Sequence, residues 1–227
     1  TVRAEEVNLR KTELRALQAQ INPHFLYNTL DSISWMCERG KNQEAVVMVN
    51  ALAQLFRISI SRGHELIPIE KELQHAEAYL QIQKYRYKNQ FTYHFTVDES
   101  CLHCLCNKIT LQPIIENAIV HGLDLMGDSG HIEITVKPDG DDILLIVADD
   151  GIGIPEADRS RIFERFYRVD KARSRESGGT GLGLSIATEI VQRHHGSLTL
   201  VDRPGPGTTV RLELPITQPI GGEDSHE

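Results

Sequence analysis

The sequence predicts an α+β protein, with an antiparallel helical hairpin at the N-terminus and an α/β sandwich at the C-terminus. Residues 5–39 contain no glycine and carry apolar side chains at helical spacing. Residues 91–97 instead alternate apolar and polar side chains, as a strand with one buried face does. The later strand-like runs are joined by short turns and not by repeated helical crossovers, so we expect one sheet with helices on a single face.

Two helices form the predicted hairpin, and a break at residues 40–42 separates them. Each helix carries one apolar stripe, made of Leu14, Leu17, Ile21, Phe25, Ile33 and Met36 in the first and of Val46, Val49, Ala53, Phe56 and Ile60 in the second. A hairpin alone cannot enclose both stripes, so we expect two chains to form a four-helix bundle as a homodimer. The alternative is a hairpin that packs on the rest of its own chain.

The second part begins near Pro68. We set the boundaries at 1–66 for the hairpin, 67–218 for the sandwich and 219–227 for a disordered tail. Helices are expected near residues 69–88, 113–121, 156–163 and 182–195. Strands at 132–137 and 143–148 should form a hairpin around a turn at 138–140, and two last strands are expected at 197–201 and 208–214.

Composition restricts the partners. A net charge of −8 argues against nonspecific binding of nucleic acid, since that surface needs a surplus of lysine and arginine. We find neither an apolar run long enough to span a membrane nor a leader. The chain begins at Thr1 inside a predicted helix, so we expect it to be cut from a longer protein.

Three of the four cysteines lie together in the run from Cys101 through His103 and Cys104 to Cys106. Three sulfurs and an imidazole are enough for a zinc site. Structural zinc sites usually draw their ligands from two separated segments, however, and the alternation with leucine also suits a buried segment. We therefore favour reduced thiols and no metal at this run.

Two glycine-rich stretches, at 149–154 and 178–184, indicate a nucleotide site, because residues without a Cβ let backbone N–H groups approach a phosphate closely. Asp149 follows an apolar strand, and its carboxylate is suited to accept a hydrogen bond from an exocyclic amine such as that of adenine. Gly151 and Gly153 open room for a planar base beside it. An ordinary turn has the same composition, so this stretch gains its meaning from the other motifs.

Asn117 lies in the predicted helix at 113–121, and its side-chain oxygen is a hard neutral ligand of the kind that Mg²⁺ prefers. His121 follows one helical turn later on the same face. Glu116 points to another face and stays unassigned.

The second stretch contains Gly179, Thr180, Gly181, Leu182 and Gly183, and it opens a helix whose first amides should bind the triphosphate. The polar run before it is expected to form a mobile lid.

The base of this lid should be held by Phe163 and Phe166. Basic residues in the same region are within reach of phosphate, although a solvated surface run explains most of them equally well; they are Arg168, Lys171, Arg173 and Arg175.

His24 is the candidate nucleophile among ten histidines. It lies in the first helix of the hairpin and directly follows Pro23, which should bend the helix and turn the imidazole outward. Neutral imidazole is a competent nucleophile near neutral pH.

Together these motifs resemble those of sensor histidine kinases, over residues 14–216. The run from Asn22 through His24 to Asn28 is similar to the Asn-Pro-His-Phe-Leu-Tyr-Asn motif of the LytS/YesM-like kinases, whereas the lid and second glycine stretch look more like the better-known kinase class. That class has an acidic residue after its phosphorylated histidine, where this chain has Phe25, so the base for His24 stays open.

The resemblance implies the ATP-binding fold that histidine kinases share with type II topoisomerases and some chaperones. It implies that Asp149 holds adenine, that Asn117 coordinates Mg²⁺, that His121 contacts phosphate and that Thr208, in the final Gly-Thr pair, supports the lid.

We therefore expect ATP-dependent autophosphorylation of His24, followed by transfer to an aspartate of a response regulator. The chain would be the cytoplasmic catalytic portion of a kinase whose membrane-bound sensor lies upstream. The alternative is a dimeric, nucleotide-gated signalling module without autokinase activity.

Overall fold

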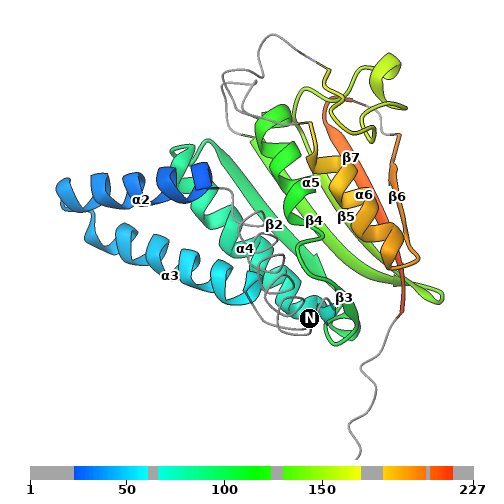
Figure 1. The fold of residues 1–227 in the computed structure, drawn as a ribbon, viewed down its shortest axis with the longest axis horizontal. Coiled ribbons are helices and arrows are strands. Elements are labelled where there is room, and N and C mark those ends of the chain that lie inside the picture. Colours follow the sequence, from blue (N-terminus) through cyan, green and yellow to red (C-terminus); the bar gives the residue numbers. More distant parts are fainter. Residues whose placement is uncertain (1–22, 61–65, 124–129, 170–180, 203–204, 217–227) are drawn as a thin grey trace, which may run out of the picture.

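The computed structural model describes residues 23–60, 66–123, 130–169, 181–202 and 205–216. A helical hairpin lies on one side of the molecule and a sheet with its covering helices on the other, with one long helix between them (Figure 1). The α+β class with a helical N-terminal part and a C-terminal α/β sheet is thereby confirmed.

The hairpin consists of α2 (Pro23–Glu38) and α3 (Asn42–Ser59). Gly40 adopts a φ of +72°, which only glycine takes readily, and the amide of Lys41 donates to the carbonyl of Met36. One face of the second helix is buried, including Met48, Leu52 and Leu55. The expected helical hairpin with a break at 40–42 is confirmed for the described residues, and residues 1–22 lie outside them.

Helix α4 (Ile69–Arg86) joins the hairpin to the rest of the molecule. Near its start, His75 is fully buried and its Nε2 lies 3.0 Å from the Ser59 hydroxyl at the end of α3. Farther along, the Tyr79 ring stacks on Phe25 of α2, with ring centroids 5.4 Å apart. The hairpin therefore rests on α4 through both of its helices.

Five strands form the main sheet within the described residues, in the order β2-β4-β5-β7-β6. Their bounds are β2 (Phe91–Val97), β4 (Gly130–Asp139), β5 (Asp142–Asp149), β6 (Ser197–Leu200) and β7 (Thr208–Pro215). The pair β2 and β4 is parallel, whereas the other pairs are antiparallel. Alternate side chains of β4, namely Ile132, Ile134 and Val136, are buried, as one covered face requires.

Helices cover that apolar face (Figure 1). Besides α4 they are α5 (Gln112–Asn117), which continues into the π-helical turn η2 (Ala118–Leu123), and α6 (Gly183–Arg193). Leu184, Ala187 and Val191 of α6 are buried. The short strands β1 (Leu66–Pro68) and β3 (Leu105–Asn107) form a separate antiparallel pair, and the 3₁₀ turns η1 (Glu99–Cys101) and η3 (Glu156–Asp158) complete the elements.

Two sequence expectations about elements are wrong. The helix expected at 156–163 is only the single turn η3, and residues 159–163 continue as irregular turns. The hairpin turn lies at Gly140 and Asp141, later than expected, since strand pairing continues through Asp139.

The cysteine run does not form a shared ligand set. Cys101, Cys104 and Cys106 are buried, whereas His103 is exposed. Among the described residues, no group of three His, Cys, Asp or Glu side chains could hold a metal ion. Burial raises the pKa of Cys106 well above its usual value.

None of the helices in the described ranges has the length and apolarity that crossing a bilayer requires.

The burial of His75 predicts a pH-dependent contribution to stability. Desolvation lowers its pKa from 6.5 to about 4, so the folded chain holds the ring neutral while the unfolded chain protonates it below pH 6.5. We expect the free energy of unfolding to lose on the order of 3 kcal/mol from this group between pH 7 and pH 4. Urea titrations of the wild type and of His75→Gln should therefore converge as the pH falls, and a constant difference would contradict this assignment.

Candidate functional site

Asp149, the last residue of β5, is the centre of the candidate nucleotide site. Its side chain is only 4% exposed. The carboxylate oxygen Oδ1 accepts the backbone N–H of Gly151 at 2.9 Å and that of Thr208 at 3.2 Å. The register of β5 on β7 brings this about, because it sets Asp149 directly opposite Thr208. Thr208 thus lies beside Asp149, the residue proposed to bind adenine.

Three glycines allow the backbone to close around this carboxylate. A Cβ on Gly122 would lie 2.8 Å from Asp149 Oδ1, and one on Gly151 would lie 2.5 Å from the backbone of Gly122. Gly207 is the most constrained, since its φ is +100° and a Cβ there would lie 2.0 Å from the Asp149 carbonyl oxygen. The absence of a Cβ at these glycines lets η2, the end of β5 and the start of β7 approach closely at one point. Gly153 also has a positive φ, of +76°.

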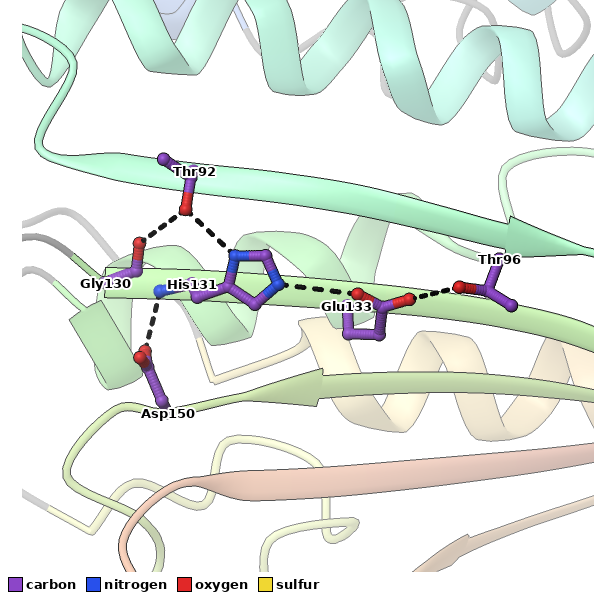
Figure 2. Close-up of polar contacts among 6 residues, drawn as sticks. All are labelled: Thr92, Thr96, Gly130, His131, Glu133 and Asp150. Carbon is purple, nitrogen blue, oxygen red and sulfur yellow. Dashed lines mark hydrogen bonds and ion pairs between the residues drawn. The ribbon is translucent and has the colours of Figure 1, made fainter.

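Asp150 has a different role from its neighbour. Its Oδ1 accepts the backbone N–H of His131 at 2.7 Å, which holds the loop after β5 to the start of β4. Figure 2 shows this carboxylate beside a surface chain of contacts through Thr92, His131 and Glu133. Asp150 therefore stabilises the fold, whereas Asp149 is the carboxylate at the glycine cradle formed by Gly122, Gly151 and Gly207.

Asn117 is the last residue of α5 before the π-helical turn η2. It is half-buried, and its side-chain amide makes no hydrogen bond to another residue in the described ranges. A neutral oxygen in this setting fits a Mg²⁺ ligand. The backbone of residues 118–123 leaves the regular α-helical spacing, whereas the side chain of His121 lies outside what the structure describes, so its expected role stays a prediction.

The second glycine stretch is described only in part, since Gly179 and Thr180 lie outside the described residues. Gly181 has a φ of +69°, and Leu182 precedes the start of α6 at Gly183. No described side chain caps this helix, and uncapped first amides are groups that can bind an anion. The far end of α6 is held by the Asn107 amide, which donates to the Ile190 carbonyl at 3.0 Å.

The expected role of Phe166 in holding the lid stays a prediction, because residues 170–180 lie outside the described residues. Phe166 itself is 70% exposed with a φ of +65°, and its backbone N–H donates to the Gly181 carbonyl. Phe163 does pack against the core, and so does Tyr167, whose hydroxyl donates to Asp158. The next residue, Arg168, has Nε and Nη2 shielded from solvent and without a hydrogen-bond partner among the described residues.

His24 is exposed in the first turn of α2. One turn later, the side-chain nitrogen of Asn28 lies 3.2 Å from His24 Nε2 and 3.3 Å from Nδ1. Sequence reasoning gave Asn28 no role, although its spacing of four residues places it on the same helical face.

A cluster on α4 holds the residue after this histidine. Tyr79 stacks on Phe25, and the Arg86 guanidinium lies over the Phe25 ring, 5.8 Å from its centroid. Burial, and then the charge of Glu116, raise the pKa of Tyr79. Glu116 therefore belongs electrostatically to the cluster that holds α2.

Two families match the chain. Residues 12–91 match the family described as "Histidine kinase", and residues 106–218 match the "Histidine kinase-, DNA gyrase B-, and HSP90-like ATPase" family. The chain is 32% identical over 219 residues to the sensor histidine kinase YesM of Bacillus subtilis strain 168. The aligned region covers 95% of this chain and 35% of YesM. It is 33% identical over 186 residues to the sensor histidine kinase BtsS of Escherichia coli K12, which covers 82% of this chain and 32% of BtsS. It thus spans about a third of these relatives.

Solved structures share the fold. The catalytic domain of histidine kinase ThkA is 24% identical with a TM-score of 0.53, over 67% of this chain and 95% of that one. Full-length ShkA in complex with AMPPNP is 21% identical with a TM-score of 0.54, over 82% of this chain and 39% of that one.

Gly207 provides a test of the cradle. We expect Gly207→Ala to abolish binding of ATP analogues and to lower the free energy of unfolding by about 2–4 kcal/mol, because the methyl group meets the Asp149 carbonyl. Gly205→Ala is the matched control, since its φ is +93° but a Cβ there meets nothing within 4 Å. Equal affinity of the two variants in calorimetric titrations would show that the cradle does not shape the site.

Proposed function

This chain belongs to the sensor histidine kinases of the LytS/YesM type, and from that membership we propose that it binds Mg·ATP in its C-terminal part and transfers the γ-phosphoryl group to His24. The observation that carries the proposal is the buried Asp149 carboxylate, on which three glycine-bearing segments converge. The exposed His24 lies on a helix docked to the same body through Phe25 and Tyr79.

The residues at the cradle divide the nucleotide between them. Asp149 accepts a hydrogen bond from the exocyclic amine of adenine, and Gly151 and Gly153 leave space for the base. The amides at the start of α6, around Leu182 and Gly183, receive phosphate oxygens.

The charge of the triphosphate is met from two further sides. Asn117 is the proposed Mg²⁺ ligand, and bound Mg²⁺ neutralises charge on the phosphates. Arg168 is the proposed basic partner, because two nitrogens of its guanidinium are shielded from solvent and have no hydrogen-bond partner in the described part of the chain. Gly179, Thr180, Gly181, His121 and Thr208 complete the proposed set.

The transfer step needs little covalent help from the protein. A ring nitrogen of His24 that carries no proton attacks the γ-phosphorus, the bond to the oxygen shared with the β-phosphate breaks, and ADP leaves. Asn28 orients the imidazole, because its side-chain nitrogen lies within hydrogen-bond distance of the ring. We propose that the hairpin and the C-terminal part move relative to each other to bring His24 to the γ-phosphate.

The hairpin supports a homodimer. Large apolar side chains are exposed along both of its helices, namely Tyr27, Leu30, Trp35, Val46, Val47 and Val49. A shallow hollow of about 350 Å³ between the helices is lined by Ile33, Ala45 and Val46 among others. A second copy of the hairpin that covers these side chains forms the four-helix bundle.

In the whole protein, phosphorylated His24 passes its phosphoryl group to an aspartate of a response regulator. A sensor in the membrane precedes this portion, which faces the cytoplasm.

His24→Gln tests the nucleophile. We expect γ-labelled ATP to leave acid-labile label on the wild type and none on the variant, because glutamine has no nucleophilic ring nitrogen. Binding of ATP analogues should be unchanged, and His94→Gln, an exposed histidine on β2, is the matched control. Label on His24→Gln equal to that on the wild type would place the phosphoacceptor elsewhere.

Val46→Glu tests the dimer. Val46 is 58% exposed in one chain, and a glutamate buried in an apolar interface is strongly disfavoured. We expect sedimentation equilibrium to give a dimer for the wild type and a monomer for the variant. Val201→Glu, on the sheet side, should remain dimeric, and a wild-type chain that sediments as a monomer would refute the bundle.

A further inference from the structure

Glu72 is a fully buried carboxylate on α4 that has no place in the proposed chemistry. Its two oxygens accept two different backbone amides, with Oε2 2.8 Å from the Ile109 nitrogen and Oε1 2.8 Å from the Leu111 nitrogen. Burial raises its pKa to about 7, even though backbone hydrogen bonds act to lower it. Folding thus buries a carboxylate, which costs free energy. Both of its oxygens accept hydrogen bonds from one short turn, residues 109–111.

The turn that Glu72 holds is strained. Ile109 has a φ of +62°, a region that a β-branched residue avoids. Such a conformation persists only where the surroundings enforce it. The two bonds from Glu72 lie on either side of Thr110, whose hydroxyl donates to the Asn107 carbonyl at 2.6 Å and closes the turn.

This turn determines where α5 begins, and therefore where Asn117 lies. Leu111 immediately precedes the helix and is fully buried. The helix has only six residues, Gln112–Asn117, so a change of direction at its start displaces its end. Within the described ranges no side chain caps its first turn, and the side chain of Glu72 accepts the amide of Leu111 at its N-terminal boundary.

The same turn also contacts the hairpin. The Lys108 ammonium lies 3.4 Å from the backbone carbonyl of Ser59, the last residue of α3. The Ser59 hydroxyl in turn meets His75, one helical turn after Glu72 on α4. The strained turn therefore lies between the end of the hairpin and the helix that carries Asn117.

We propose that Glu72 is a positioning residue of the nucleotide site, whose carboxylate holds the strained turn at Ile109 in the shape that presents Asn117 to Mg²⁺. This inference rests on the proposed function, because it assigns the metal to Asn117. A carboxylate is required because both of its oxygens accept, whereas an amide offers one oxygen and turns an NH₂ group toward the second N–H.

Glu72→Gln tests the proposal in calorimetric titrations of the full chain with AMPPNP, with and without Mg²⁺. We expect the dissociation constant with Mg²⁺ to rise about tenfold, from the loss of one buried hydrogen bond, and the constant without Mg²⁺ to change by less than about twofold. Glu77→Gln removes the same charge from an exposed position on α4 and is the matched control. Equal weakening with and without Mg²⁺ would mean a merely structural role and would overturn the proposal.

A double-mutant cycle locates the effect at Asn117. In an Asn117→Ala background, Glu72→Gln should cause no further loss of Mg²⁺-dependent affinity, because the side chain through which it acts is gone. A further tenfold loss in that background would overturn the proposal.

Two measurements keep the test decisive. If Glu72→Gln does not fold, Ile109→Gly in the same chain should restore folding, since glycine takes a positive φ without support, and an unfolded double variant would overturn the proposal. Hydrogen exchange of the nucleotide-free chain should show lost protection at Ile109, Leu111 and α5 in Glu72→Gln. If the affinity of the wild type for AMPPNP does not depend on Mg²⁺, the proposed function fails. The role of Glu72 is then tested by hydrogen exchange alone, and unchanged protection at Ile109, Leu111 and α5 in Glu72→Gln would overturn it.

Discussion

The close approach of three backbone segments to the Asp149 carboxylate is the constraint on which the C-terminal part depends. β5 ends at Asp149, β7 begins opposite it at Thr208, and η2 passes beside it at Gly122. Burying a carboxylate is costly unless hydrogen bonds satisfy it, and two backbone N–H groups do so here. The end of β5, the start of β7, the π-helical turn and the glycine loop therefore meet at one charged group, which forms the base of the candidate site.

Helix α4 connects that base to the hairpin. It receives Phe25 from α2 through Tyr79 and Ser59 from α3 through His75, and it reaches the start of α5 through Glu72. One helix thus contacts the neighbour of the proposed phosphoacceptor, the end of the hairpin and the turn before the proposed metal ligand. A rotation or shift of α4 would change all three together, which is a physical route for coupling the hairpin to the nucleotide site.

Local sequence patterns predicted much of the secondary structure. The helices of the hairpin, the pair β4 and β5, and α6 follow from periodicity and from the glycines at their ends. The parallel pairing of β2 with β4 and the pairing of Leu66 with Asn107 were not predictable, because tertiary packing joins residues far apart in sequence. Glu72 resembles any surface residue of a charged helix, and nothing local marks its burial. The candidate site residues were proposed from residue chemistry and the family resemblance, whereas the pairing of Asp149 with Thr208 became evident only from the strand register.

The central claim is that Asp149 accepts a hydrogen bond from the exocyclic amine of adenine. Replacing that amine tests the claim most directly. Inosine triphosphate carries a carbonyl at this position, which would face the carboxylate without a proton to donate. We predict that the chain binds Mg·ATP about a hundredfold or more tightly than Mg·ITP in competition titrations, as expected of a site built around a buried hydrogen bond. Comparable affinities for the two nucleotides would contradict the account.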